Sequence, residues 1–139
     1  MDIATLMFIA YRAMDERVIR AMRDAGFDVT VAQARIAQRI AEGGSRLTDL
    51  AEQAQVTKQT ASVLVAALEH QGLVERAPNP ADGRARLIRF TQKGLTASNR
   101  AREVVMGVEQ EWNDHLGPEL SGCLRETLTK LREIADPYR

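Results

Sequence analysis

Apolar residues recur at intervals of three and four between residues 2 and 24, which places them along one stripe of a helix. Gly26 follows in the position of a C-terminal cap. Thr30 and Gln33 then have the spacing of a capping box, in which each side chain satisfies a free backbone amide. The first third of the chain is therefore predicted to form two helices, the second running to Glu42.

Two further helices are predicted in close succession, a short one over residues 48–55 and a longer one over 57–71. Thr48 and Thr57 are their N-cap candidates, and Gly72 closes the second helix. Because so few residues link them, these helices cannot lie antiparallel and should cross steeply. That arrangement is typical of a helix-turn-helix.

After this pair the pattern becomes typical of β-structure. Residues 73–76 and 86–91 are predicted to be short strands. The segment 77–83 between them is dense in proline, glycine and other turn formers. We therefore expect a hairpin with a long, mobile tip.

Two long helices are predicted to complete the chain. Thr91 caps the first, which runs to about Leu116, and Pro118 suits the first turn of the second. The apolar stripes of these two helices and of the first helix are larger than the helix pair and hairpin between them can cover. We therefore expect a second copy of the chain to bury the remaining apolar surface. The expected dimer-interface residues are Ile3, Met7, Val108, Trp112, Leu116, Leu120, Leu124, Leu128 and Leu131.

The predicted fold class is mainly α with a small β-hairpin wing, in one domain over residues 1–139. Within it, a winged helix-turn-helix over 30–91, whose wing is 73–91, is flanked by dimerisation helices over 1–25 and 92–139. The length suits one compact domain, and a hydrophobic content of 45% is enough for a core. No apolar run approaches a membrane span and no signal peptide begins the chain, so we expect a cytoplasmic protein with no membrane partner.

The formal net charge is zero, but its distribution is uneven. Between Asp82 and Lys93 one acidic residue stands against four basic ones, a local net charge of +3 that the rest of the chain balances with −3. A locally basic tip on an acidic body can still dock on phosphates. The alternative interpretation is a solvated loop.

The helix over 57–71 has the composition of one that reads DNA. Ala61, Leu64, Val65 and Leu68 form its inward stripe, while the face at its N-terminal end is polar. Glutamine can pair with adenine, lysine with guanine, and serine or threonine with either bases or phosphates. An arginine beyond the wing's turn can enter the minor groove. The expected DNA-contacting residues are Thr57, Lys58, Gln59, Thr60, Ser62, Asp82, Arg84 and Arg86, with Asp82 able to hold Arg84 in one rotamer.

The sequence resembles the MarR family of winged-helix regulators (multiple-antibiotic-resistance regulators) in three stretches, 47–60, 68–74 and 82–94. The last has the family's wing signature: an acidic residue two before an arginine, apolar strand positions, then Thr-x-x-Gly. The resemblance implies a homodimeric repressor, with two recognition helices in successive major grooves of a pseudo-palindromic operator. It also implies release by a small, often aromatic, acid. It places Arg84 at the wing residue that enters the minor groove.

Two features depart from the family's pattern. Gly83 occupies a wing position that is often arginine, and Val63, Ala66 and Ala67 leave the recognition helix poor in basic residues. Fewer phosphate contacts imply weaker affinity and a shallower dependence on salt.

Phe8, Tyr11 and Arg12 on the first helix offer an aromatic floor and a cation, which suits an anionic aromatic effector. The alternative is that these residues only pack in the core. No cofactor or metal site is expected, since His70 and His115 are far apart and the single cysteine, Cys123, suits a packing role.

No arrangement of residues points to an enzyme. The alternatives to a ligand-released repressor are a winged-helix module for protein interaction and a DNA-binding activator or anti-repressor without a ligand.

Overall fold

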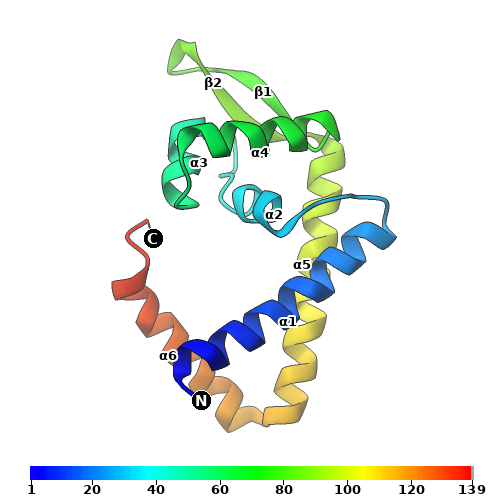
Figure 1. Cartoon of the computed structure of the whole chain (residues 1–139), viewed down its shortest axis with the longest axis vertical. Coiled ribbons are helices and arrows are strands. Elements are labelled where there is room, and N and C mark those ends of the chain that lie inside the picture. The colour runs from blue at the N-terminus through cyan, green and yellow to red at the C-terminus, as the bar shows by residue number, and fades with distance from the viewer. Residues whose placement is uncertain (139) are drawn as a thin grey trace.

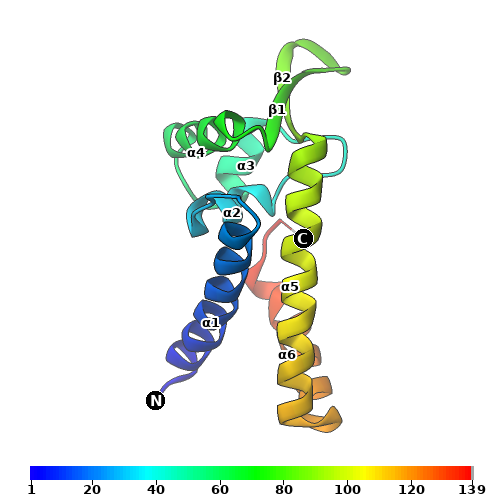
Figure 2. The same cartoon turned by 90° about the vertical axis from the view of Figure 1, so that its right-hand side faces the viewer.

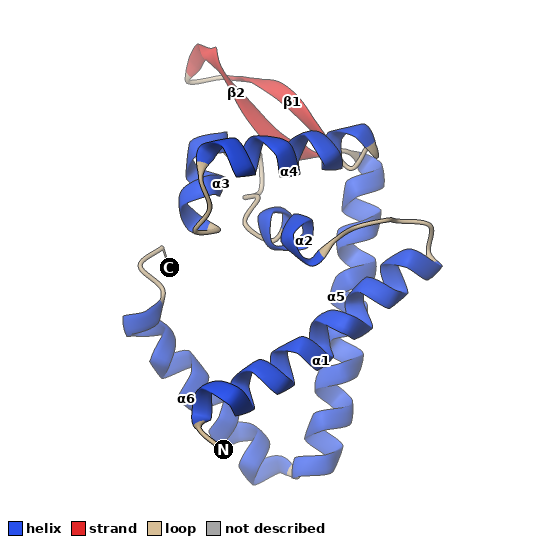
Figure 3. Cartoon of the chain, in the orientation of Figure 1, coloured by secondary structure: helices blue, strands red, loops and turns tan. Residues whose placement is uncertain are grey.

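The computed structural model describes residues 1–138 and has the predicted fold class. Helices α2, α3 and α4 and a two-stranded hairpin form one end of the molecule, and the long helices α1, α5 and α6 extend away from it (Figures 1 and 3). The elements are α1 (Ile3–Asp24), α2 (Val31–Ala37), α3 (Leu47–Gln53), α4 (Lys58–His70), β1 (Val74–Asn79), β2 (Asp82–Phe90), α5 (Gln92–Leu116) and α6 (Pro118–Ala135).

The predicted N-caps of three helices are confirmed. Thr30 and Gln33 form the capping box of α2, Thr57 accepts a hydrogen bond from the amide of Thr60 at the start of α4, and Thr91 accepts one from that of Gly94 at the start of α5. Each contact satisfies a backbone amide that the first helical turn leaves without a partner. These starts depend only on neighbours in sequence.

The predicted end of the second helix, at Glu42, is wrong: α2 ends at Ala37. The chain tightens into turns there, with the amide of Ile40 bonded to the carbonyl of Ala37, and it must then reach the wing. Ser45 and Ile88 exchange backbone hydrogen bonds of 2.8 and 2.9 Å. A helix continued to Glu42 would carry the chain away from this pairing.

The predicted start of the next helix is also wrong. Arg46, not Thr48, occupies the N-cap position of α3, and its guanidinium pairs with Asp49 at 3.0 Å. The bridge at Ser45 fixes the backbone just before this point, so the helix begins two residues earlier than the side-chain pattern suggests. Gln55, in the turn that joins α3 to α4, has a positive φ of 57°.

The wing is longer and its tip shorter than predicted. β1 and β2 pair antiparallel from Val74 opposite Phe90 to Asn79 opposite Asp82, with an irregular register after Pro78. Pro78 is tolerated because each strand of a two-stranded sheet has a free edge. The tip is therefore a turn at Pro80 and Ala81, not the seven-residue loop expected from the turn formers.

A compact core joins α4 to its neighbours. Its fully buried side chains include Ile36 from α2, Leu50 from α3, Val65 and Leu68 from α4, and Ile88 from β2. The predicted inward stripe of α4 is confirmed at three positions, and the fourth, Leu64, is half-buried. This packing fixes which face of α4 points outward.

The long helices are held together more loosely. α1 packs on α5, where Arg17 forms a two-pronged ion pair with Glu111 at 2.8 Å for both bonds. α6 follows α5 but has no buried residue (Figure 2). None of the helices described over residues 1–138 is both long and apolar enough to cross a membrane.

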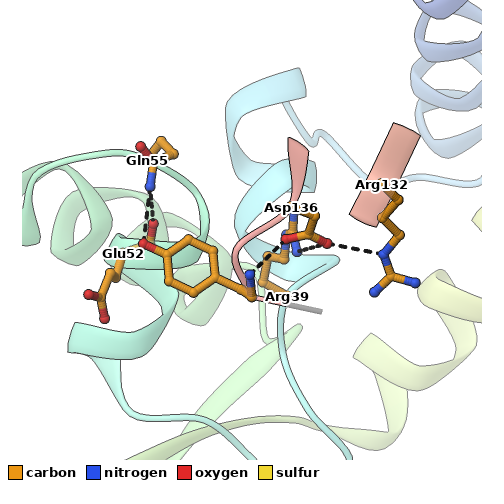
Figure 4. A network of polar contacts seen from close by, with 6 residues as sticks. Arg39, Glu52, Gln55, Arg132 and Asp136 are labelled. Carbon is orange, nitrogen blue, oxygen red and sulfur yellow. Dashed lines mark hydrogen bonds and ion pairs between the residues drawn. The ribbon is translucent and has the colours of Figure 1, made fainter. Parts of the chain in front are cut away.

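The segment after α6 returns to the helix-turn-helix. Asp136 lies 3.9 Å from Arg39, after α2, and also pairs with Arg132 (Figure 4). The side-chain amide of Gln55 donates to the Tyr138 hydroxyl at 3.3 Å. The end of α6 is thus tied to the turn that precedes α4.

Candidate nucleic-acid interface

The N-terminal end of α4 presents polar side chains to solvent. Lys58 and Gln59 are exposed, and neither has a hydrogen-bond or ion-pair partner among residues 1–138. Ser62 lies one turn further along and is half-buried. The free amides of the first turn and the positive end of the helix dipole lie beside them. This end of α4 can therefore accept an anion and offer hydrogen bonds to it.

Thr57 and Thr60 are engaged with each other. The Thr57 hydroxyl accepts from the amide of Thr60 at 3.0 Å and lies 2.9 Å from its hydroxyl. Thr57 therefore caps the start of α4. The side chains of Lys58 and Gln59, which have no partner among the described residues, remain available to a ligand.

Two arginines extend from the wing without a carboxylate partner among the described residues. Arg84 and Arg86 are both exposed on β2, near the tip. The expected pairing of Asp82 with the Arg84 guanidinium is wrong. The Asp82 carboxylate instead accepts a hydrogen bond from the Arg84 backbone amide at 3.0 Å. Asp82 thus shapes the turn and leaves the Arg84 side chain free.

The other basic side chains near the wing are engaged within the protein. Arg76 lies 3.5 Å from Glu69 of α4, and Arg89 lies 2.8 Å from Glu75 across the hairpin. A hydrogen bond to Asp49 raises the pKa of Arg46, which keeps that group charged but occupied. Lys93 donates to the backbone carbonyl of Gln71 at 2.7 Å. The cations of this end that have no partner among residues 1–138 are therefore Lys58, Arg84 and Arg86.

A second candidate site lies on α1, away from α4. Phe8, Tyr11 and Arg12 line one open cavity of about 490 Å³, as their helical spacing suggested. Arg35 of α2 stacks over the Tyr11 ring at 5.6 Å, and Arg20 and Arg23 complete the cavity's basic side.

These three arginines were not predicted from the sequence. Arg20 and Arg23 continue the spacing of Phe8 and Arg12 along α1, so periodicity could have found them. Arg35 joins them only through packing. Asp15 lies 3.9 Å from Arg35. Burial raises the pKa of Asp15, although the positive charge of Arg35 acts to lower it.

Most of the expected dimer-interface residues keep surface available for a partner. Ile3, Met7, Leu120, Leu124, Leu128 and Leu131 are exposed, and Trp112 and Leu116 are half-buried. Val108 is the exception, since it is only 2% exposed within a single chain and has little surface left to offer.

Known proteins share the fold of this chain. Residues 27–85 match the sequence model of the MarR family. The structure of the transcriptional regulator Tm0710 from Thermotoga maritima is similar at 30% identity and a TM-score of 0.66, over 94% of this chain and 91% of that one. No curated protein sequence matches the chain.

Two more distant structures share the fold. The reduced form of MarR from E. coli has 22% identity and a TM-score of 0.78, over 94% of this chain and 96% of that one. The transcriptional repressor CouR, bound to a 23-mer DNA duplex, has 22% identity and a TM-score of 0.74, over 94% and 92%. With its winged helix-turn-helix, its wing signature and these likenesses, the chain belongs to the MarR family.

Proposed function

We propose that this protein is a sequence-specific, DNA-binding transcriptional regulator and has no catalytic role. One observation carries the proposal: the polar end of α4 and two free wing arginines lie at the same end of the molecule, opposite the long helices (Figure 1). α4 would enter the major groove, and Arg84 would reach the adjacent minor groove. That CouR, which shares the fold, is bound to a DNA duplex supports this assignment.

The local charge suits DNA better than the net charge suggests. The chain is neutral overall, but Asp49, Glu69 and Glu75 are paired with Arg46, Arg76 and Arg89. The Asp82 carboxylate accepts from a backbone amide and pairs with no arginine among the described residues. Few free cations imply few released counterions, so binding should be moderate in strength with a shallow salt dependence. Specificity would then rest mainly on base contacts by α4.

The protein would act as a homodimer through its long helices, residues 1–25 and 92–139. α6 buries none of its residues within one chain, although Leu120, Leu124 and Leu128 form an apolar stripe along it. An apolar groove of about 730 Å³ lies between α1, α5 and α6. Apolar surfaces of this extent are rarely left in water, and a second copy would cover them.

A two-fold dimer places two copies of α4 on one face of DNA, which matches a pseudo-palindromic operator. Repression follows when that operator overlaps a promoter. We further propose that a small aromatic anion binds the cavity of Phe8, Tyr11 and Arg12 and releases the DNA. Arg20 and Arg23 would neutralise its carboxylate, and Tyr11 would contact its ring.

One observation favours the alternative function as a protein-interaction module. Val63 is 66% exposed on the outward face of α4, where an apolar side chain suits a protein partner. The free cations at Lys58, Arg84 and Arg86 favour DNA.

The test is a titration of the full chain against the DNA upstream of its own gene and against a scrambled duplex, at two salt concentrations. Tighter binding to the upstream DNA, weakening with salt, supports the regulator. Equal and weak binding to both duplexes would instead favour the protein-interaction module. Benzoate, added to the complex, tests release, with Arg23→Ala as the variant expected to resist it.

A further inference from the structure

Val63 occupies a position that the fold does not explain. Ala61, Val65 and Leu68 form the buried face of α4, and Val63 points away from all three. Valine is a weaker helix former than alanine, so an exposed valine adds nothing to the helix itself. Its exposed side chain is therefore available to a ligand.

Helix geometry places Val63 on the same line as Gln59. Residues four apart lie roughly 40° apart around the axis and one turn along it. Gln59 is exposed and free among the described residues, and it stands near the N-terminal end of α4. The two side chains therefore face the same surface in succession, a polar one followed by an apolar one.

The charges around this line favour a polyanion over an apolar protein partner. α4 contains one acidic residue, Glu69, and Arg76 neutralises it at 3.5 Å. The free charges of α4 and the wing are Lys58, Arg84 and Arg86. A ligand that contacts both Val63 and these charges must therefore be apolar at one point and anionic at others.

The major groove of DNA offers that combination at one base only. Thymine carries a C5 methyl group there beside its O4 acceptor, near the phosphates of the backbone, whereas the other three bases carry no methyl group. We propose that Val63 packs against the methyl group of a thymine, beside the base that Gln59 reads, and selects thymine at one position of each half-site. This inference rests on the proposed DNA-binding function.

The test removes the methyl group and nothing else. The operator is recovered by selection from a random-sequence duplex library, and each thymine is then replaced in turn by deoxyuridine, which keeps every hydrogen-bonding group. Dissociation constants are measured by fluorescence anisotropy for the full chain, for Val63→Ala, and for the matched variant Ala66→Ser on the same face. Val63 is exposed, so its truncation leaves the core intact.

One symmetry-related pair of thymines should respond. Loss of one buried methyl group weakens binding about fourfold, hence roughly 15-fold for both half-sites together. Val63→Ala should lose most of that sensitivity, to within about twofold, while Ala66→Ser retains it.

Two other outcomes would overturn the inference in distinguishable ways. If deoxyuridine weakens the wild type and Val63→Ala equally at every position, Val63 reads no thymine, and the regulator function stands. If the wild type selects no sequence at all, the proposed DNA-binding function fails and this inference fails with it.

Discussion

The carbonyl oxygen of Leu73 lies directly against the backbone of Gly94, where the wing returns to the body of the protein. A methyl group on Gly94 would overlap that oxygen and come within 3.0 Å of the Phe90 ring. The same carbonyl accepts a hydrogen bond from the amide of Thr91 at 3.1 Å, so it cannot move away cheaply. The glycine of the Thr-x-x-Gly signature is thus required by a close approach of backbone to backbone.

We predict that Gly94→Ala destabilises the protein by about 3 kcal/mol, because the backbone must shift to admit the methyl group. Thermal unfolding, followed by circular dichroism, should show a fall of roughly 10 °C. Gly107→Ala is the matched control on the same helix, since nothing in the chain lies within 4 Å of the added methyl group. It should raise stability by up to about 1 kcal/mol through helix propensity. Equal effects of the two substitutions would contradict the close-approach argument.

Arg84→Ala should weaken DNA binding more than Lys58→Ala does. Arg84 is free near the wing tip, and a guanidinium in a narrow minor groove meets a concentrated negative potential. Lys58 is at the N-terminal end of α4, and the loss of one phosphate contact there makes the salt slope shallower by about one. Anisotropy titrations at several salt concentrations give both quantities. Arg89→Ala is the control, since its guanidinium already pairs with Glu75; comparable losses for all three variants would refute the ranking.

Local signals predicted the starts of α2, α4 and α5, and a long-range contact accounts for the errors at the end of α2 and the start of α3. A cap such as Thr57 or Thr91 depends on residues three positions away, so it can be read directly from the sequence. The end of α2 depends on Ser45 meeting Ile88, more than forty residues later. No local pattern carries that information.

The same division applies to the candidate sites. Lys58, Gln59 and Arg84 were predictable because one helix face and one turn present them. Arg35 joins Phe8 and Tyr11 through the packing of α2 beside α1, which helical spacing does not reveal. Val63 stood out from the sequence as a departure, and its exposure gave that departure a physical meaning.

Leu128→Glu should convert the proposed dimer to monomers. Leu128 lies in the middle of the exposed stripe of α6 and lines the apolar groove, so a carboxylate there would be buried without a partner. Sedimentation velocity at micromolar concentration measures the oligomeric state. Thr127→Glu is the control on the same helix, where the neighbouring side chain is polar and exposed. Dimers that survive Leu128→Glu would argue that another surface joins the chains.

The ion pair between Arg17 and Glu111 should make the contact of α1 with α5 sensitive to acid. Hydrogen bonding to Arg17 holds the pKa of Glu111 below its ordinary value of 4.5. A carboxyl group with a lowered pKa stabilises the fold above its unfolded-state pKa, and that contribution is lost as the pH falls through the folded-state value. Glu111→Gln should therefore lower the melting temperature at pH 7, and the difference from the wild type should shrink below about pH 4.

Glu103→Gln separates this tie between helices from a general loss of charge on α5. Glu103 pairs with Arg100 at 3.3 Å within α5 itself, so its removal leaves α1 untouched. A pair three residues apart on an exposed helix face contributes little to stability. The melting temperature of Glu103→Gln should stay close to that of the wild type across the same pH range. If both substitutions gave the same dependence of melting temperature on pH, the pair between Arg17 and Glu111 would stabilise the protein no more than the local pair between Arg100 and Glu103.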